Sequence, residues 1–422
     1  MSLLLTNATF IDWQSLEFKK THLLVEEGLR GGIQFIDDPS QYPEYQIIDC
    51  EGKLVTKSFG VGHHHAYSAM AKGMPAPKVN PQNFHEILQY VWWNLDKCLD
   101  KETVEYSALL TAMACAKAGS TFVIDHHAAP NFIEGSLEIM AKAFENVGVN
   151  HLLCYEITDR DGSDKATQGI VETESYLNKY QGLVGLHASF TVGDETLKKS
   201  VSLANRLQSG LHIHIGEDLY DQTQCEEVYH KRVVQRLADA GGLESSKTLL
   251  VHCLHLDENE RSLIKNSPVW VAQNAESNMN NNVGYFNGAG LGERILFGTD
   301  GMHSDMLQSA KAAFFVGQRF DNINYSSVYR RFRNIHRYLK TNNFTGDGEN
   351  NLVILDYRSG TEINQQNFLG HFVFGLKAEQ ISHVISNGKL IVANQNLITV
   401  DENEILKESR KLANFLWQRM KK

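Results

Sequence analysis

Short apolar runs recur through the middle of the chain, and longer segments of helical period separate them. The runs cover 54–65, 120–127, 150–158, 182–189, 210–218, 247–253, 269–277 and 294–301. Short continuous apolar runs are typical of buried strands, whereas the segments between them, such as 83–99 and 171–181, have the period of helices. Eight strand–helix units in succession predict an α/β fold, a (β/α)8 TIM barrel.

The two ends of the chain have a different pattern. Residues 1–55 and 350–400 contain short strand-like runs, and turn sequences such as VEEG and SNGK separate them. We predict a small β-sandwich domain built from both termini, residues 1–55 together with 346–401. The barrel domain is expected over 56–345, and a C-terminal helix over 402–422.

Composition and charge narrow the class of protein. The chain has 422 residues, 42% of them hydrophobic and 21% charged, which indicates a globular protein. Its net charge of −10 argues against nucleic-acid binding. The six cysteines stand singly, as in reduced cytoplasmic proteins, and we see neither a signal peptide nor a membrane span. We therefore expect a cytoplasmic protein whose partner is a small molecule, and a homo-oligomer is compatible with the sequence.

Polar side chains stand at the C-terminal end of nearly every apolar run. They are His63 and His65, Asp125 to His127, Glu156, His187, His214 and Glu217, His252, Asn274 and Asn278, and Asp300. Burying such groups costs free energy unless they are paired. Because the carboxyl ends of barrel strands meet on one face, where barrel enzymes have their active sites, we predict that these residues form an active site.

A run of three histidines ends the first strand. Because side chains alternate along a strand, His63 and His65 share one face and His64 points to the other. Two imidazoles at this spacing can bind one cation, although the motif alone is equally compatible with a chance cluster.

Further strands offer the remaining ligands. His212 and His214 share a face, and we choose His214 because it is nearer the strand end and begins H-x-x-E with Glu217. Asp300 follows the eighth strand and offers a carboxylate. Three imidazoles and one carboxylate suit a catalytic metal that keeps a position open for water. We predict one divalent metal, zinc in preference to iron.

Two neighbouring groups suit proton transfer and polarisation. Glu217 could move protons between water and substrate. His252 could be another ligand, a satisfied core histidine or, our preferred interpretation, a hydrogen-bond donor to the bond that is attacked. The fourth strand carries His187 and no bridging lysine, which favours one metal over two. His126 and His127 could hold a second metal, but we prefer that they line the pocket or bond Asp125.

The located residues resemble the amidohydrolase superfamily, in its cytosine-deaminase-like and chlorohydrolase-like branch. The motifs H-x-H, H-x-x-E, VHC, SN and GTD follow one another at strands one, five, six, seven and eight, and the resemblance covers nearly the whole chain. A narrower resemblance is to aminohydrolases encoded near selenium-dependent molybdenum hydroxylases. It is carried by AYSAMAKGMPAP, DHHAAP, CYEITDRDG, GLHASFTV, ESNMNN and GTDGMHSDM.

The resemblance implies a role for each matching residue. The metal ligands would be His63, His65, His214 and Asp300. Asp300 would also accept a water proton, Glu217 would be the acid and base, and His252 would bind water or the leaving group. The chain departs from the family pattern at Lys57–Ser58, where Pro-Gly is usual, and at Gln273 and Ala275, where His and Pro are common.

The segment 66–84 contains three of the seven prolines and is expected to form a lid or pocket wall. Of Trp92 and Trp93, one could stack on a heterocycle, but we favour a buried helix aromatic. Arg160 could anchor the substrate or pair with Asp159 or Asp161. The predicted substrate-binding residues are His127, Glu156, Arg160, His187, Asn278 and His303.

These features predict a metal-dependent hydrolase of C–N bonds other than peptide bonds. Its reaction would be the hydrolytic deamination of a nitrogenous heterocycle by a metal-activated water. The alternatives are a chlorohydrolase or amide hydrolase with the same site, and a non-catalytic metal- or ligand-binding protein.

Overall fold

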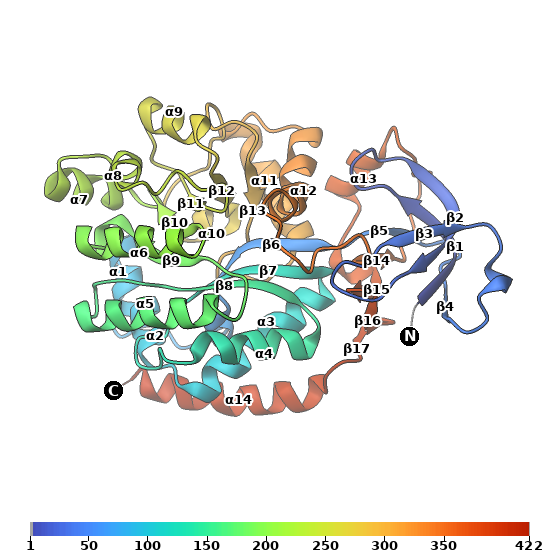
Figure 1. Cartoon of the computed structure of the whole chain (residues 1–422), viewed down its shortest axis with the longest axis horizontal. Helices are drawn as coiled ribbons and strands as arrows, with labels where there is room; N and C mark the ends of the chain where they lie inside the picture. The colour runs from blue at the N-terminus through green and yellow to red at the C-terminus, as the bar shows by residue number, and fades with distance from the viewer. Residues whose placement is uncertain (1–2, 422) are drawn as a thin grey trace.

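Eight parallel strands form the centre of the larger part of the molecule (Figure 1). The computed structural model describes residues 3–421, so Met1, Ser2 and Lys422, which the predicted domain limits include, lie outside the described residues. The strands are β6 (Phe59–His64), β7 (Ser120–His127), β8 (Asn150–Tyr155), β9 (Val184–Ala188), β10 (Leu211–Ile215), β11 (Leu249–His252), β12 (Trp270–Gln273) and β13 (Ile295–Phe297). Each lies within one of the eight apolar runs.

The strands pair in chain order as two sheets, β6 to β8 and β9 to β13, and bridges join the sheets at both seams. Leu153 and Ile157 bridge to the β9 side, and His64 bridges in parallel to Asp300 beyond β13. The backbone N–H groups of Thr299 and Asp300 both donate to His63 O, at 3.0 and 3.1 Å. The predicted barrel fold is confirmed.

Alternation along the strands produces an inner and an outer core. Phe122 and Ile124 of β7 belong to the inner cluster, whereas Val123 between them belongs to the outer core against the helices. Tyr338 of α12 (Tyr325–Thr341) also belongs to the inner cluster, and its hydroxyl donates to the carbonyl of Lys247, just before β11. Helix α12 therefore closes the end of the barrel opposite the strand carboxyl ends.

Helices cover the outside of the barrel. They include α3 (Lys101–Lys117), α4 (Ser136–Val147), α5 (Ser163–Leu177), α6 (Asp194–Arg206), α7 (Leu219–Tyr229), α8 (Val233–Asp239), α9 (Glu258–Asn266), α10 (Ala275–Asn280) and α11 (Met306–Phe320). Capping boxes start α3, at Asp100 and Thr103, and α9, at Asp257 and Glu260. Such boxes satisfy N–H groups that the first helical turn leaves unpaired.

Strands from both chain ends form one nine-stranded sheet beside the barrel. They are β1 (Leu3–Ile11), β2 (Phe18–Val25), β3 (Ile33–Ile36), β4 (Gln46–Asp49), β5 (Leu54–Lys57), β14 (Leu352–Leu355), β15 (Ile381–Ser386), β16 (Lys389–Ala393) and β17 (Asn396–Leu397). The two ends meet where β14 pairs antiparallel with β5, Leu352 opposite Lys57. The helix α13 (Phe368–Phe374) lies between β14 and β15 in the sequence. The division of the chain into domains stays a prediction.

The last helix, α14 (Glu402–Arg419), leaves this sheet and runs back along the barrel, where it contacts α3 (Figure 1). Among residues 3–421, no helix combines the length and the apolar character that crossing a membrane would require.

Candidate active site

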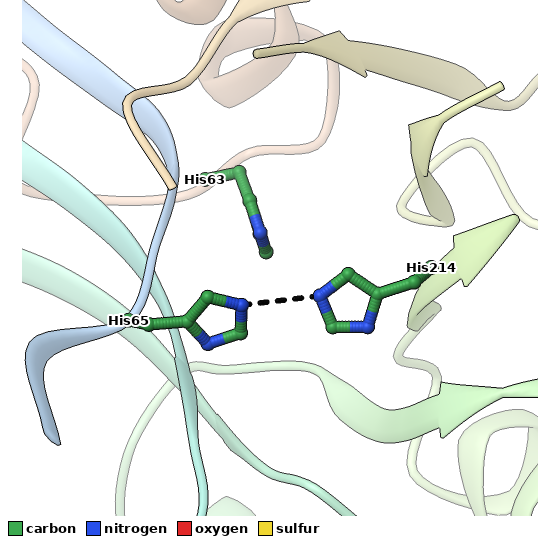
Figure 2. Close-up of side chains that lie close together, drawn as sticks. All are labelled: His63, His65 and His214. Carbon is green, nitrogen blue, oxygen red and sulfur yellow. Dashed lines mark hydrogen bonds between the residues drawn. The ribbon is translucent and has the colours of Figure 1, made fainter. Parts of the chain in front are cut away.

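Three histidines converge at the carboxyl ends of two strands on opposite sides of the barrel (Figure 2). His63 and His65 come from the end of β6, and His214 comes from β10. The His63 ring centre lies 4.8 Å from that of His65 and 5.2 Å from that of His214, while the two Nε2 atoms of His65 and His214 are 3.1 Å apart. His64 points away from this cluster, toward the Thr299 hydroxyl.

In His65 and His214, the contacts of the Nδ1 atoms show which ring nitrogen carries the hydrogen. His65 Nδ1 lies 2.7 Å from the carbonyl of His126, and His214 Nδ1 lies 2.7 Å from the carbonyl of His187. Because a carbonyl can only accept, each Nδ1 carries a hydrogen, and in a neutral ring each Nε2 then holds a lone pair. Two lone pairs 3.1 Å apart repel each other unless a proton or a metal ion lies between them. The arrangement therefore fits a metal ion.

A third nitrogen and a carboxylate complete the cluster. His63 Nε2 is buried without a hydrogen-bond partner among the described residues. Asp300 Oδ1 lies 3.1 Å from His65 Nε2 and 3.5 Å from His63 Nε2. Three imidazole nitrogens and a carboxylate oxygen are ligands that divalent zinc or iron accepts. The predicted set of His63, His65, His214 and Asp300 is thus brought together, and it fits such a metal.

Charge in the cluster is arranged for metal binding. Burial lowers the pKa of His63 and His214 well below the usual value, so both rings are neutral and free to act as ligands. Burial acts to raise the pKa of Asp300, but its contacts with His63 and His65 outweigh burial and hold that pKa well below its ordinary value. Burial likewise opposes the charged form of His65, yet the Asp300 carboxylate outweighs it and raises the pKa of His65 to about 9, so this Nε2 position favours a positive charge, either its own proton or a metal ion that replaces that proton. The cluster as a whole attracts positive charge.

Neighbouring groups hold Asp300 in place. Its Oδ1 faces the histidines, and its Oδ2 accepts a hydrogen bond of 2.5 Å from the Ser277 hydroxyl. Asp300 and His252 both adopt left-handed backbone conformations, with φ of +50° and +69°. Such conformations cost about 1–3 kcal/mol in residues other than glycine and cluster at functional sites.

Glu217 and His252 stand beside the cluster. Asn278 Nδ2 donates to His252 Nδ1 at 2.8 Å, so the hydrogen of the neutral ring lies on Nε2, which is 3.4 Å from Glu217 Oε2 and 3.9 Å from Asp300 Oδ2. With this proton arrangement His252 is a hydrogen-bond donor, although His252 also lies close enough to His63 and Asp300 to share a metal with them. Burial, together with the nearby Asp300 charge, raises the pKa of Glu217 well above its usual value. A protonated carboxyl at this position can donate a proton.

A cavity of about 150 Å³ opens onto these groups. His65, His214, Glu217 and Asp300 form its polar floor. Its other walls are contributed by Tyr67, Ser68, Phe84, Leu88, Trp92, Trp93, Glu156, Arg160, His187, Ser277, Asn280, Asn281, Gly301 and Met302. The aromatic walls suit a flat, partly apolar molecule.

The two tryptophans correct one sequence interpretation. Trp92 and Trp93 are both half-buried and both line the cavity, so the favoured interpretation of a buried helix aromatic is wrong. The expected helix at 83–99 is divided into α1 (Phe84–Ile87), one π-helical stretch (Leu88–Trp92) and α2 (Trp93–Lys97). A π-helical stretch changes the helical phase, which a uniform 3.6-residue period does not predict.

Arg160 pairs with Asp161, one of the partners considered, and also lines the cavity, while its contact with a substrate stays a prediction. It lines the cavity, and its guanidinium donates to Glu156 Oε1 at 2.8 Å and to Asp161 Oδ2 at 3.1 Å. It also contacts the buried carboxylate of Asp96. Asp159, the other partner considered, instead accepts from the backbone N–H of Gly193 and from the Thr196 hydroxyl.

The remaining predicted substrate-binding residues divide into two groups. Glu156 and His187 line the cavity beside Arg160. His127, Asn278 and His303 do not line it. His127 is fully buried between the rings of Tyr67 and Tyr155, Asn278 bonds to His252, and His303 pairs with Glu276 at 2.8 Å. Their contact with a substrate stays a prediction.

Sequence reasoning did not identify the roles of Ser277 and His212. Ser277 belongs to the SN motif, but nothing in the motif indicates that its hydroxyl holds Asp300. His212 is the histidine of β10 that is not among the predicted ligands, and its Nε2 lies 2.9 Å from His63 Nδ1. The H-x-H pattern on β10 was the available signal for His212. Gln273, where the family commonly has histidine, accepts a hydrogen bond from Arg331 and lies outside the cavity wall.

Residues 62–331 match the family model described as the amidohydrolase family. The 5-methylthioadenosine/S-adenosylhomocysteine deaminase of Syntrophomonas wolfei is 25% identical to the chain, and the match covers 88% of each protein. The 5'-deoxyadenosine deaminase of Methanopyrus kandleri is 26% identical over 93% of this chain and 94% of its own length.

Among solved structures, an adenosine deaminase from Xanthomonas campestris with bound zinc has the same fold, with a TM-score of 0.82. It is 17% identical, and the match covers 98% of each chain. The narrower resemblance to selenium-associated aminohydrolases stays a prediction.

Proposed function

The chain belongs to the amidohydrolase family, and on that premise we propose that it catalyses the hydrolytic deamination of a nitrogenous heterocycle. The observation that carries the proposal is the convergence of the buried His63 with His65, His214 and Asp300, of which the last three line the floor of one aromatic-walled cavity beside the Glu217 carboxyl. This set combines ligands for a metal with a separate proton donor.

His63, His65, His214 and Asp300 would hold one divalent metal, and we infer that it is zinc. The Xanthomonas relative contains bound zinc, and zinc accepts these donor types. When bound, such a metal lowers the pKa of water toward neutrality and so supplies a nucleophile.

The remaining steps belong to the side chains. Asp300 accepts the proton that water loses. The Ser277 hydroxyl holds Oδ2 of Asp300 in place, and Oδ1 faces the histidines. Glu217 delivers its proton to the ring nitrogen as the carbon is attacked. When the C–N bond breaks, the hydroxyl on that carbon gives its proton through Glu217 to the leaving amine, which departs as ammonia, and the proton that Asp300 took from water restores Glu217. His252 Nε2–H points between Glu217 and Asp300 and stabilises negative charge that develops there. Trp92 and Trp93 orient the flat ring over these groups.

Adenine nucleosides are the first substrate class to test. The two curated relatives are named as deaminases of methylthioadenosine, S-adenosylhomocysteine and 5'-deoxyadenosine, and the matches span most of each chain. Their identities of 25% and 26% leave the substituent on the nucleoside open.

The decisive measurement is ammonia release by zinc-loaded protein from a panel of adenine nucleosides, free purines, pyrimidines, pterins and triazines. We expect ammonia from one class of aminated heterocycle, with about one metal per chain. No ammonia from any member, or chloride release from a chlorotriazine alone, would refute deamination.

Glu217→Gln is the matched test of the proton donor. It should reduce kcat by about 10²–10⁴-fold while metal content stays at the wild-type level, because Glu217 is not a ligand. Glu172→Gln is the control, since Glu172 is a buried carboxylate that accepts backbone N–H groups of Gly135 and Leu137, away from the cavity. Unchanged turnover in Glu217→Gln would remove this residue from the mechanism.

A further inference from the structure

A line of four contacting groups runs from the metal cluster into the barrel interior. His63 Nδ1 lies 2.9 Å from His212 Nε2, and His212 Nδ1 lies 3.4 Å from Cys154 Sγ. Cys154 Sγ lies 3.5 Å from the backbone carbonyl of Asp125, to which the thiol donates. His63, His212 and Cys154 are all fully buried.

Strand geometry explains how His212 reaches this position. Leu211, Ile213 and Ile215 of β10 point outward into the main hydrophobic core, so His212 and His214 both point into the barrel. His214 lies at the level of the metal cluster. His212 lies one alternation deeper, where its ring meets the His63 ring edge-on, with centres 5.0 Å apart and planes at 76°.

The carbonyl of Asp125, at the end of this line, determines which atom donates and which accepts in each of its hydrogen bonds. A carbonyl has no hydrogen to give, so the thiol hydrogen of Cys154 points to Asp125 O and leaves sulfur lone pairs toward His212. His212 then carries its hydrogen on Nδ1 and accepts at Nε2 from His63 Nδ1–H. This arrangement leaves the lone pair of His63 on Nε2, which is the atom 3.5 Å from Asp300.

The reverse direction has the opposite effect on His63. If the thiol donated to His212, then His212 Nε2–H would donate to His63 Nδ1. The hydrogen of neutral His63 would then lie on Nε2 and block that nitrogen as a ligand. The direction of the line therefore decides whether His63 can bind a metal.

We propose that His212 and Cys154 are positioning residues that hold His63 in its metal-binding tautomer through the hydrogen-bond line ending at Asp125 O. The inference rests on the proposed metal site and goes beyond it, because neither residue touches metal or substrate. Partners that orient a metal-bound histidine contribute about 10- to 100-fold to metal affinity.

The test is zinc affinity of folded, metal-depleted protein, measured by competition with a chromophoric chelator, together with the absorption spectrum of bound Co²⁺. His212→Leu removes the acceptor, and we expect zinc binding about 10- to 100-fold weaker and a changed Co²⁺ spectrum. His212→Gln restores an acceptor oxygen and should recover most of the affinity. Cys154→Ala should weaken binding in the same direction.

Cys50→Ala is the matched control. Cys50 is fully buried and its thiol faces a carbonyl, that of Ile48 at 3.6 Å, but it contacts no histidine of the site. The zinc affinity of the Cys50→Ala variant should equal that of the wild type. A purely structural role of His212 would lower the unfolding temperature without changing zinc affinity or the Co²⁺ spectrum.

Wild-type zinc affinity in folded His212→Leu would overturn the proposal, as would equal losses in His212→Leu and His212→Gln. If His212→Leu does not fold, unchanged affinity in Cys154→Ala overturns it. The zinc-affinity measurements use no substrate. If they overturn the proposal for His212 and Cys154, the proposed deamination is unaffected, and a negative substrate panel does not change the measured zinc affinities.

Discussion

Ser277→Ala isolates the hydrogen bond that holds the outer oxygen of Asp300. The Ser277 hydroxyl donates to Asp300 Oδ2 at 2.5 Å and accepts from Asn281 Nδ2 at 3.5 Å, so its single hydrogen is committed to Asp300. Alanine removes this donor while Oδ1 still faces His65 at 3.1 Å. We therefore expect catalysis to suffer, because Asp300 is less well oriented to accept a proton, and metal content to persist.

The size of the effect follows from the kind of bond. A hydrogen bond to a charged acceptor contributes about 1.5–3 kcal/mol, and Ser277 is only 5% exposed, so solvent replaces the bond poorly. At about 1.4 kcal/mol per factor of ten, kcat/KM should fall roughly 10- to 100-fold. Ser277→Thr keeps a hydroxyl at the same position and should recover much of that loss.

The assay is steady-state kcat/KM on the substrate found in the panel, with metal content measured on the same sample. Ser209→Ala is the control, because Ser209 is a buried serine that donates to the Gly182 carbonyl on the strand seam, outside the cavity. A metal-replete Ser277→Ala enzyme within about threefold of wild type, equivalent to only ~0.7 kcal/mol, would refute this reasoning. Loss of the metal itself would show that Ser277 supports ligation rather than proton transfer.

Three other predictions test the scaffold of the site. Chelation should lower the unfolding midpoint in calorimetry and added zinc should restore it, since free metal at about one hundred times its Kd stabilises by ~2.7 kcal/mol. Gly62→Ala places a Cβ 2.2 Å from Leu296 Cδ1 and should cost about 1–3 kcal/mol in denaturant unfolding, whereas Gly370→Ala, with nothing within 4 Å, should be near neutral. Burial raises the pKa of Asp125 from 3.8 to about 7, so its contribution to stability is fully present below 3.8 and is lost as pH rises through about 7. Relative to Asp125→Asn, the wild type should therefore lose up to about 1.4 kcal/mol of unfolding free energy per pH unit in that window, and parallel stability curves would contradict the shift.

The barrel and the clustering of the proposed ligands were predictable because both follow from short-range pattern. The eight buried runs correspond to eight strands, and chain order alone places their carboxyl ends on one face. Alternation within β6 separates His63 and His65 from His64, as the structure shows. Such inferences need only the period of a strand and the parallel arrangement of a barrel.

The cavity wall could not be predicted in the same way. The π-helical stretch at Leu88–Trp92 alters the phase of the helix and brings both Trp92 and Trp93 to the cavity. Arg160 meets Asp96, which is 64 positions away in the sequence. Contacts of this kind depend on how whole elements pack, and no local pattern records them.

The identities of the residues in this site do not reveal which atoms donate and which accept in its hydrogen bonds. His63, His65 and His214 are the same residue type, yet the Nδ1 atom of His63 has a different kind of partner from those of the other two. His65 and His214 face backbone carbonyls, which can only accept, so their tautomers are fixed without any other side chain. His63 faces another histidine, which can either donate or accept, and its tautomer is fixed only two groups further on, at a carbonyl. Of the three proposed imidazole ligands, His63 is therefore the one whose metal binding should respond to substitutions that touch neither metal nor substrate.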